Sequence, residues 1–270
     1  YLNGAAGSFF DPYTLARNTE FTEVDEEDYY YTDRICVEAT RQIEAFAKSN
    51  KPFFQYVAFT AAHWPIHAPE KSIQKYIKTY EGGWEKLRNE RYARMLKMGI
   101  IDKERWPLPP LESRVKPWDT IDHKPWRIRN MAVYAAMVDH MDQAVGTIVG
   151  ALEKTKQLDN TLIIYFHDNG ACPEHLGGNG WNTANNVLAK AKKAGKTIAV
   201  GDKFDVPMGG PMTYGSVGHN WANAQNTPMR RYKANVHNGG AGTPAIVHWP
   251  AGLKTKPGSI SDQRGHVIDM

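Results

Sequence analysis

The 270-residue sequence has few cysteines, no long apolar run and no strong excess of one charge. Cys36 and Cys172 are too few to form a disulfide scaffold. No apolar stretch reaches the roughly 18 residues of a membrane-spanning helix, so we expect no membrane segment. The net charge of +4 is mildly basic, and the densest basic run, residues 190–196, lacks the interleaved aromatic residues of a nucleic-acid site. These absences argue against a disulfide-rich domain, a membrane protein and a nucleic-acid-binding protein.

Neither end of the sequence resembles a natural chain terminus. Residues 1–10 contain no initiating Met and no basic leader, and residues 265–270 stop within an apolar run. We therefore expect both ends to be cuts through a longer chain. Hydrophobic residues make up 41% of the sequence and charged residues 23%, which is typical of a globular protein with a sizeable core. We expect one incomplete domain over residues 1–270.

The apolar periodicity predicts alternating helices and strands. Helical spacing or composition predicts three largely helical segments, at residues 32–50, 70–98 and 128–156. Aromatic and β-branched runs predict three buried strands, at residues 53–59, 161–166 and 245–249. Residues 105–120 are rich in proline and are expected to form an extended surface excursion. The alternation of helices and strands indicates an α/β sheet with parallel neighbours.

Two of the predicted strands lead into side chains that can perform chemistry. The first strand is followed by His63 and His67, and the second by Asp168 and Asn169. In open α/β sheets, ligands bind at the carboxyl ends of the strands. This placement is the main indication, from the residues alone, of an active site.

Each candidate residue also allows a structural interpretation. Asp168 and Asn169 offer hard oxygen ligands for Ca²⁺ or Mg²⁺, or form an Asx turn that ends the strand. His63 suits proton transfer to a leaving oxygen or a hydrogen bond to an anion, but also a loop histidine bonded to the backbone. Lys233 suits a tetrahedral anion, or a solvated basic loop. His67 is either structural or lines a pocket.

Tryptophans and Cys172 are similarly ambiguous. Trp64, Trp181 and Trp221, together with His67, suit either the lining of a sugar-binding pocket or core packing. Cys172 precedes Pro173-Glu174 and fits a small packing residue near a turn better than a nucleophile.

Taken together, these motifs resemble the type I sulfatases, and more closely their bacterial arylsulfatase-like members. The resemblance covers nearly the whole chain and rests on ordered motifs: Pro52-Phe53-Phe54, Ala62-His63-Trp64-Pro65, His67-Ala68-Pro69, Val133-Tyr134-Ala135-Ala136-Met137-Val138-Asp139, Asp168-Asn169-Gly170, Thr227-Pro228, Lys233, Gly239-Gly240, Pro244 and His248-Trp249-Pro250. It implies an alkaline-phosphatase-like α/β fold, with a mixed, mostly parallel sheet flanked by helices and incomplete in this chain.

The resemblance also implies the hydrolysis of sulfate esters at a Ca²⁺-centred site, with Mg²⁺ as the less suited ion. Carried over by position, Asp168 and Asn169 are metal ligands, Lys233 contacts the sulfate, and His63 binds the sulfate or assists departure of the alcohol. His67 is placed with the substrate-binding residues. We expect a sulfated small molecule or carbohydrate as substrate, and a periplasmic or secreted location.

The sequence departs from the family pattern in ways that leave a half-site. Such enzymes use a formylglycine nucleophile made in a Cys/Ser-x-Pro/Ala-x-Arg motif, which this sequence lacks. The acidic pair that completes the metal site is absent too, and we expect both features in a segment upstream of Tyr1. His167 stands where a small residue usually precedes Asp-Asn-Gly, and Asn238 replaces the common Glu before Gly-Gly. These two substitutions are expected to alter the metal environment locally.

Three functions are consistent with this half-site. The leading hypothesis is a sulfuric ester hydrolase present as a fragment. The second is a phosphoester or phosphonate hydrolase of the same superfamily, and the third is a non-catalytic homologue that binds sulfated glycans. The N-terminal motif of the longer protein would discriminate between them.

Overall fold

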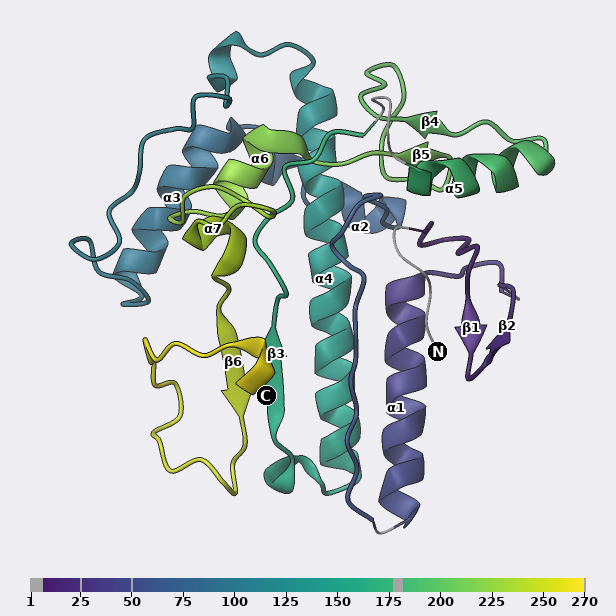
Figure 1. Cartoon of the computed structure of the whole chain (residues 1–270), viewed down its shortest axis with the longest axis vertical. Helices are drawn as coiled ribbons and strands as arrows, with labels where there is room; N and C mark the ends of the chain where they lie inside the picture. Colours follow the sequence, from purple (N-terminus) through teal and green to yellow (C-terminus); the bar gives the residue numbers. More distant parts are fainter. Residues whose placement is uncertain (1–6, 25, 50, 177–181, 270) are drawn as a thin grey trace.

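A long central helix organises the protein, which we describe from a computed structural model covering residues 7–24, 26–49, 51–176 and 182–269. This helix, α4 (Lys124–Lys154), has Pro125 in its first turn, where the fixed φ of proline suits the helix. The helices α1 (Tyr31–Ser49) and α2 (Glu70–Gln74) pack against it (Figure 1). Both long helices predicted by periodicity are confirmed, although α4 starts four residues earlier than expected.

The core forms along one face of α4. Ala132, Val133, Ala136 and Met137 are fully buried there, and their small or flexible side chains allow close packing of the neighbouring elements. Each large apolar side chain buried in such a core contributes about 1.5–3 kcal/mol. Within the described residues, none of the helices has the length and apolar character needed to cross a membrane.

Several short helices and one pair of strands lie at the level of the amino-terminal half of α4, and another pair of strands lies at the level of its carboxyl-terminal half (Figure 1). On one side lie α3 (Gly83–Lys97), which begins at the predicted Gly-Gly break, and α6 (Gly218–Gln225). The remaining helical elements are η1 (Ile77–Tyr80), η2 (Trp118–Thr120), η3 (Leu158–Asn160), α5 (Asn182–Lys193), α7 (Asn238–Ala241) and η4 (Val267–Asp269). The long stretch between the second and third predicted strands thus contains regular structure that its weak periodicity did not reveal.

The described strands form three two-stranded sheets. They are β1 (Ala16–Arg17) with β2 (Glu20–Phe21), β3 (Ile163–Phe166) with β6 (Ala245–His248), and β4 (Ala199–Val200) with β5 (Thr213–Tyr214). The α/β class and the strands at β3 and β6 agree with the prediction. Their pairing differs from the parallel arrangement expected: β3 and β6 are antiparallel, with Phe166 opposite Ala245, and only β4 and β5 are parallel.

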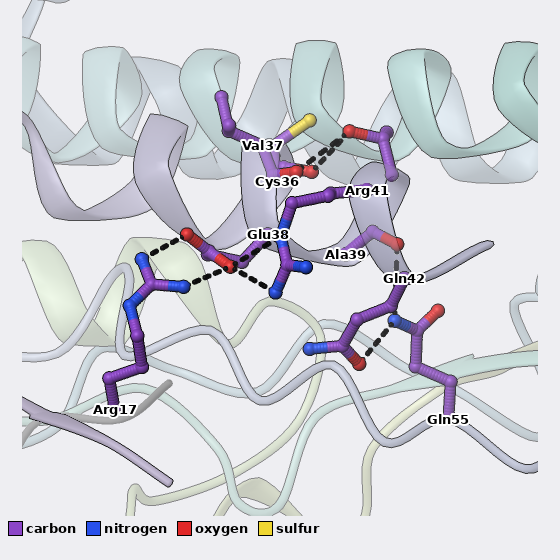
Figure 2. A network of polar contacts seen from close by, with 9 residues as sticks. Arg17, Cys36, Val37, Glu38, Ala39, Arg41, Gln42 and Gln55 are labelled. Carbon is purple, nitrogen blue, oxygen red and sulfur yellow. Dashed lines mark hydrogen bonds and ion pairs between the residues drawn. The ribbon is translucent and has the colours of Figure 1, made fainter. Parts of the chain in front are cut away.

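The predicted strand at residues 53–59 is wrong as a paired, buried strand. The segment is extended, but it joins none of the described sheets. Its exposure alternates along the chain, with Phe54 90% and Tyr56 77% exposed. Gln55 points the other way, and its Nε2 donates to Ala39 O and Gln42 Oε1 of α1, each at 3.2 Å (Figure 2). The segment is therefore anchored to α1 through its inward side chains.

A nearly buried carboxylate joins the first hairpin to α1. Glu38 accepts hydrogen bonds from Arg17 of β1 at 3.0 Å and from Arg41 one turn along α1 at 3.0 and 3.1 Å (Figure 2). Burial alone raises the pKa of Glu38, but the two arginines outweigh it and hold the pKa below its usual value. This charge-assisted network keeps Glu38 ionised and fixes the hairpin against the helix.

His67 is buried and hydrogen-bonded within the fold, and its expected contact with substrate stays a prediction. Its side chain is 1% exposed. The backbone N–H of Phe9 lies 3.3 Å from Nδ1, and Nε2 lies 2.7 Å from Thr213 O of β5. Both contacts are satisfied by the neutral tautomer protonated at Nε2. Burial lowers the pKa of His67 to about 4.

This depressed pKa predicts a loss of stability in mild acid. The unfolded chain binds a proton at this histidine below about pH 6.5, whereas the folded chain resists protonation until about pH 4. Stability is therefore lost as the pH falls through this window, by about 2 to 3 kcal/mol between pH 7.5 and 4.5. Urea unfolding at both pH values should show this loss, and His67→Gln should reduce the difference by a similar amount. The exposed-site control His266→Gln should keep the wild-type difference; equal pH dependence in all three proteins would contradict the prediction.

Candidate active site

The side-chain amide of Asn226 joins the end of β3 to the loop at residues 228–240. Its Oδ1 accepts a hydrogen bond from the backbone of Ala171 at 2.8 Å. Its Nδ2 donates to Arg231 O at 2.7 Å and to Gly239 O at 2.6 Å. One side chain thus satisfies three backbone groups from segments that are distant in sequence. We call this arrangement the Asn226 clamp.

Glycine at position 170 allows the two segments to approach closely. A Cβ atom there would lie 1.7 Å from Gly239 O, which no other residue could accommodate without moving the backbone. Backbone hydrogen bonds reinforce the contact, from Gly170 N to Gly240 O at 3.2 Å and from Lys233 N to Ala171 O at 3.0 Å. The contact brings Lys233 to the carboxyl end of β3.

Lys233 meets His63 and Glu174 in a compact polar cluster. Its Nζ lies 2.9 Å from His63 Nε2 and 3.9 Å from Glu174 Oε2. The same carboxylate oxygen accepts from the indole N–H of Trp64 and from the Cys172 thiol, the latter at 3.0 Å. The structure therefore brings together two of the predicted residues, His63 and Lys233, around a carboxylate that the sequence had not indicated.

The hydrogen bonds assign the protonation states within this cluster. His63 Nδ1 lies 2.7 Å from the carbonyl oxygen of Trp64, so Nδ1 carries the proton and Nε2 accepts from Lys233. Burial lowers the pKa of His63, and the positive charge of Lys233 lowers it further. Burial raises the pKa of Glu174, but hydrogen bonds from Cys172 and Trp64 and the charge of Lys233 outweigh it, and the pKa is lowered. The resting cluster is a neutral imidazole, an ammonium and a carboxylate.

Neither cysteine is poised as a nucleophile. Burial, together with the adjacent Glu174, raises the pKa of the Cys172 thiol to about 12. Burial also raises the pKa of Cys36, whose thiol points to the backbone oxygen of Ala144 at 3.5 Å. Because the thiolate is the reactive form, both thiols are inert at neutral pH. This agrees with the interpretation of Cys172 as a packing residue.

Asp168 and Asn169 lie directly after β3, near this cluster. Asp168 is exposed, and its charge acts on the titration of His63. Asn169 Nδ2 donates to Gly170 O at 3.0 Å, which leaves its Oδ1 available. Two such oxygens suit Ca²⁺ in kind, but Ca²⁺ takes six to eight. Within the described ranges no three His, Cys, Asp or Glu side chains gather around a possible ion, and the role of Asp168 and Asn169 as metal ligands stays a prediction.

The structure also shows the surroundings of His167 and Asn238, the two residues that depart from the family pattern, and of two of the tryptophans. His167 Nε2 contacts Tyr165 Oη at 3.1 Å, and Asn238 is exposed at the start of α7. Trp221 is 1% exposed and packs in the core, whereas Trp64 is 6% exposed but hydrogen-bonds into the cluster. Trp181 lies outside the described residues.

The chain belongs to the sulfatase family, because the family model described as Sulfatase matches residues 4–270. It is 31% identical over 249 residues to an uncharacterized sulfatase of Schizosaccharomyces pombe, covering 90% of this chain and 42% of that protein. It is 30% identical over 285 residues to the arylsulfatase of Klebsiella aerogenes, covering 100% of this chain and 57% of that enzyme. The chain thus spans about half the length of the curated relatives it matches. Family membership agrees with the predicted alkaline-phosphatase-like α/β class.

Solved structures also show similarity. The crystal structure of Ps i-CgsB in complex with k-i-k-neocarrahexaose has a TM-score of 0.45 and 21% identity, covering 86% of this chain and 30% of that chain. The crystal structure of yidJ from Bacteroides fragilis has a TM-score of 0.47 and 15% identity, covering 90% of this chain and 36% of that chain. The family assignment rests on the family model and the curated relatives.

The contact between Lys233 and His63 predicts a coupled titration. Replacing Lys233 by Met removes the nearby positive charge that lowers the pKa of His63, so this pKa should rise. An NMR titration of the imidazole resonances of His63 measures the change directly. The control Lys71→Met removes an exposed lysine of α2 and should leave the titration unchanged. An unaltered His63 midpoint in Lys233→Met would show that the two groups are not in contact in solution.

Proposed function

We propose that the protein of which this chain is part hydrolyses sulfate esters, and that His63 and Lys233, which lie in a cluster with Glu174, bind the sulfate group. The contact between Lys233 and His63 is the observation that carries the proposal, because it places a cation beside an imidazole at the end of β3. Membership in the sulfatase family and the similarity to an arylsulfatase support it. Since the chain spans about half of those relatives, the activity is proposed for the whole protein.

Lys233 would bind the negatively charged oxygens of the sulfate. In the resting state its ammonium donates to His63 and lies near Glu174, which holds it in place. A sulfate ester that binds to Lys233 would offset the positive charge that lowers the pKa of His63. His63 would then take up a proton from solvent at Nε2 and would donate it to the departing alcohol oxygen as the S–O bond to that oxygen breaks.

Glu174 would act as a positioning residue in this scheme. Its carboxylate accepts from the Trp64 indole and the Cys172 thiol while it faces Lys233. Those two donors orient the carboxylate, and the carboxylate orients the ammonium. A neutral amide at this position would lose the electrostatic attraction and would leave Lys233 less fixed.

Asp168 and Asn169 would supply two of the oxygen ligands of a Ca²⁺ ion, with the remainder coming from other parts of the protein. When bound, such an ion stabilises negative charge that develops on sulfate oxygens. Neither cysteine of this chain stands in the Cys-x-Pro/Ala-x-Arg motif from which a formylglycine is made. A formylglycine would be supplied outside this chain, so the isolated 270 residues should have negligible sulfatase activity.

The activity can be tested with the whole protein, purified in the presence of Ca²⁺, and the aryl sulfate p-nitrophenyl sulfate. We expect turnover, with kcat lowered by about 10²–10⁴-fold in Lys233→Ala and in His63→Ala. Glu174→Gln should have a smaller effect, and the control Lys71→Ala should match the wild type. Circular dichroism spectra of the variants establish that each is folded.

Several outcomes would contradict the proposal. Wild-type turnover in both Lys233→Ala and His63→Ala would remove the assigned roles. Preferential hydrolysis of p-nitrophenyl phosphate would favour a phosphoester hydrolase, and binding of sulfated glycans without turnover would favour a non-catalytic homologue. Turnover by the isolated 270-residue chain would refute the placement of the nucleophile outside it.

A further inference from the structure

A groove of about 400 Å³ lies between the proline-rich excursion and the loop that carries Lys233. Its lining includes Arg105, Trp106, Pro109, Pro228, Arg230 and His237. It combines an aromatic side chain with two guanidinium groups, and no acidic residue lines it. These are the features of a site for an anionic ligand with an apolar face.

Side chains of α3 hold the wall formed by the excursion. Tyr92 Oη donates to the backbone oxygen of Trp106 at 2.7 Å. The guanidinium of Arg88, a residue 6% exposed, donates to the backbone oxygen of Pro109. Although residues 105–109 form no helix or strand, their backbone is therefore fixed to a helix. A groove wall fixed in this way avoids part of the ordering cost of binding.

The opposite wall is fixed to α3 and to the excursion itself. Arg91 Nε donates to Thr227 O at 3.1 Å, just before Pro228. Arg231 pairs with Glu112, with Nη1 and Oε2 at 3.3 Å, and so connects the two walls directly. The groove is thus assembled before any ligand binds.

The two lining arginines are the charges available to a ligand. Arg230 is exposed and, in the part of the chain that the structure describes, has no carboxylate partner, since Glu112 pairs with the neighbouring Arg231. Arg105 pairs with Asp262 at 2.8 Å, but their side chains are 62% and 73% exposed. Such an exposed ion pair contributes little to stability, so an anionic ligand can displace Asp262 at small cost.

We propose that this groove is a subsite for an anionic carbohydrate. A sugar ring would pack on Trp106, and Arg105 and Arg230 would bind its sulfate or carboxylate groups. The proposal rests on the proposed function, because it places a second charged unit of a sulfated glycan near the residue that binds the reacting sulfate. Arg230 precedes Lys233 by three residues, so their Cα atoms are at most about 11 Å apart. Neighbouring units of one oligosaccharide can span such a distance.

Binding of dextran sulfate oligosaccharides to the whole protein, measured by isothermal titration calorimetry, tests the subsite. We expect Arg105→Ala/Arg230→Ala to weaken binding by at least about tenfold, with a smaller salt dependence. The control Lys71→Ala/Lys78→Ala removes the same charge from exposed positions outside the groove and should bind as the wild type. Equal affinity of the arginine variant and the wild type would overturn the proposal.

Two further sets of binding measurements test the contact with Trp106 and the class of anion that the groove binds. Trp106→Ala should weaken binding at least about fivefold, and Trp106→Tyr should retain most of it. Binding of dextran sulfate alone supports a sulfate subsite, and arginine-dependent binding of polygalacturonate oligosaccharides supports one that also accepts carboxylates. Equally tight binding of neutral dextran would overturn the role of the arginines.

Failure of the subsite is distinguishable from failure of the proposed function. Normal turnover of p-nitrophenyl sulfate by the wild type, with no effect of the groove variants on dextran sulfate affinity, would reject the subsite alone. Arginine-dependent binding without any aryl sulfate turnover would reject the hydrolase and retain the subsite.

Discussion

The candidate site depends on the Asn226 clamp. Asp168 and Asn169 are far from Lys233 in the sequence, and their proximity requires the end of β3 and the Lys233 loop to pack backbone against backbone. In such contacts some backbone N–H and C=O groups lie outside the regular hydrogen bonding of a helix or sheet. Each such group that is buried without a partner would cost about 1–3 kcal/mol. Asn226 satisfies three of them with one amide, and Gly170 provides the space. A shorter side chain at position 226, or one with only a donor or only an acceptor, could not make all three hydrogen bonds.

Much of the scaffold could be predicted from the sequence because its elements are long or strongly patterned. Apolar periodicity located α1 and α4, and the compact apolar runs located β3 and β6. Asp168 and Asn169 do follow a strand, as the sequence predicted, but their role in a site stays a prediction. The direction in which the strands pair was less predictable, because it depends on the path of the chain between them. The chain makes a long excursion after β3, and β6 then pairs with β3 in the antiparallel direction. The extended segment at 53–59 has the composition of a strand, but composition cannot show whether a neighbour pairs with it.

The candidate site was only partly predictable, because some of its residues stand in no sequence motif and are brought there by tertiary contacts. His63 and Lys233 stand in recognisable motifs, whereas Glu174 follows a cysteine and a proline with no distinctive spacing. Its role comes from three contacts that span the tertiary structure, to Trp64, Cys172 and Lys233. His67 shows the opposite case, since it shares a motif with His63 but faces the core. His63 and His67 lie in one loop after the extended segment at residues 53–59, and this loop turns His67 toward the core but leaves His63 near Lys233.

The charges of the cluster explain why His63 and Lys233 are compatible at such short range. A lysine beside a histidine disfavours the imidazolium, and burial disfavours it further, so the pair holds one positive charge rather than two. Glu174 balances that charge, which lets the ammonium remain in a partly desolvated place. A bound sulfate would change this balance, because its negative charge would permit a second proton on His63. Under the proposed function the arrangement would couple anion binding to the appearance of a proton donor, and this coupling would be lost if either Lys233 or the depressed pKa of His63 were absent.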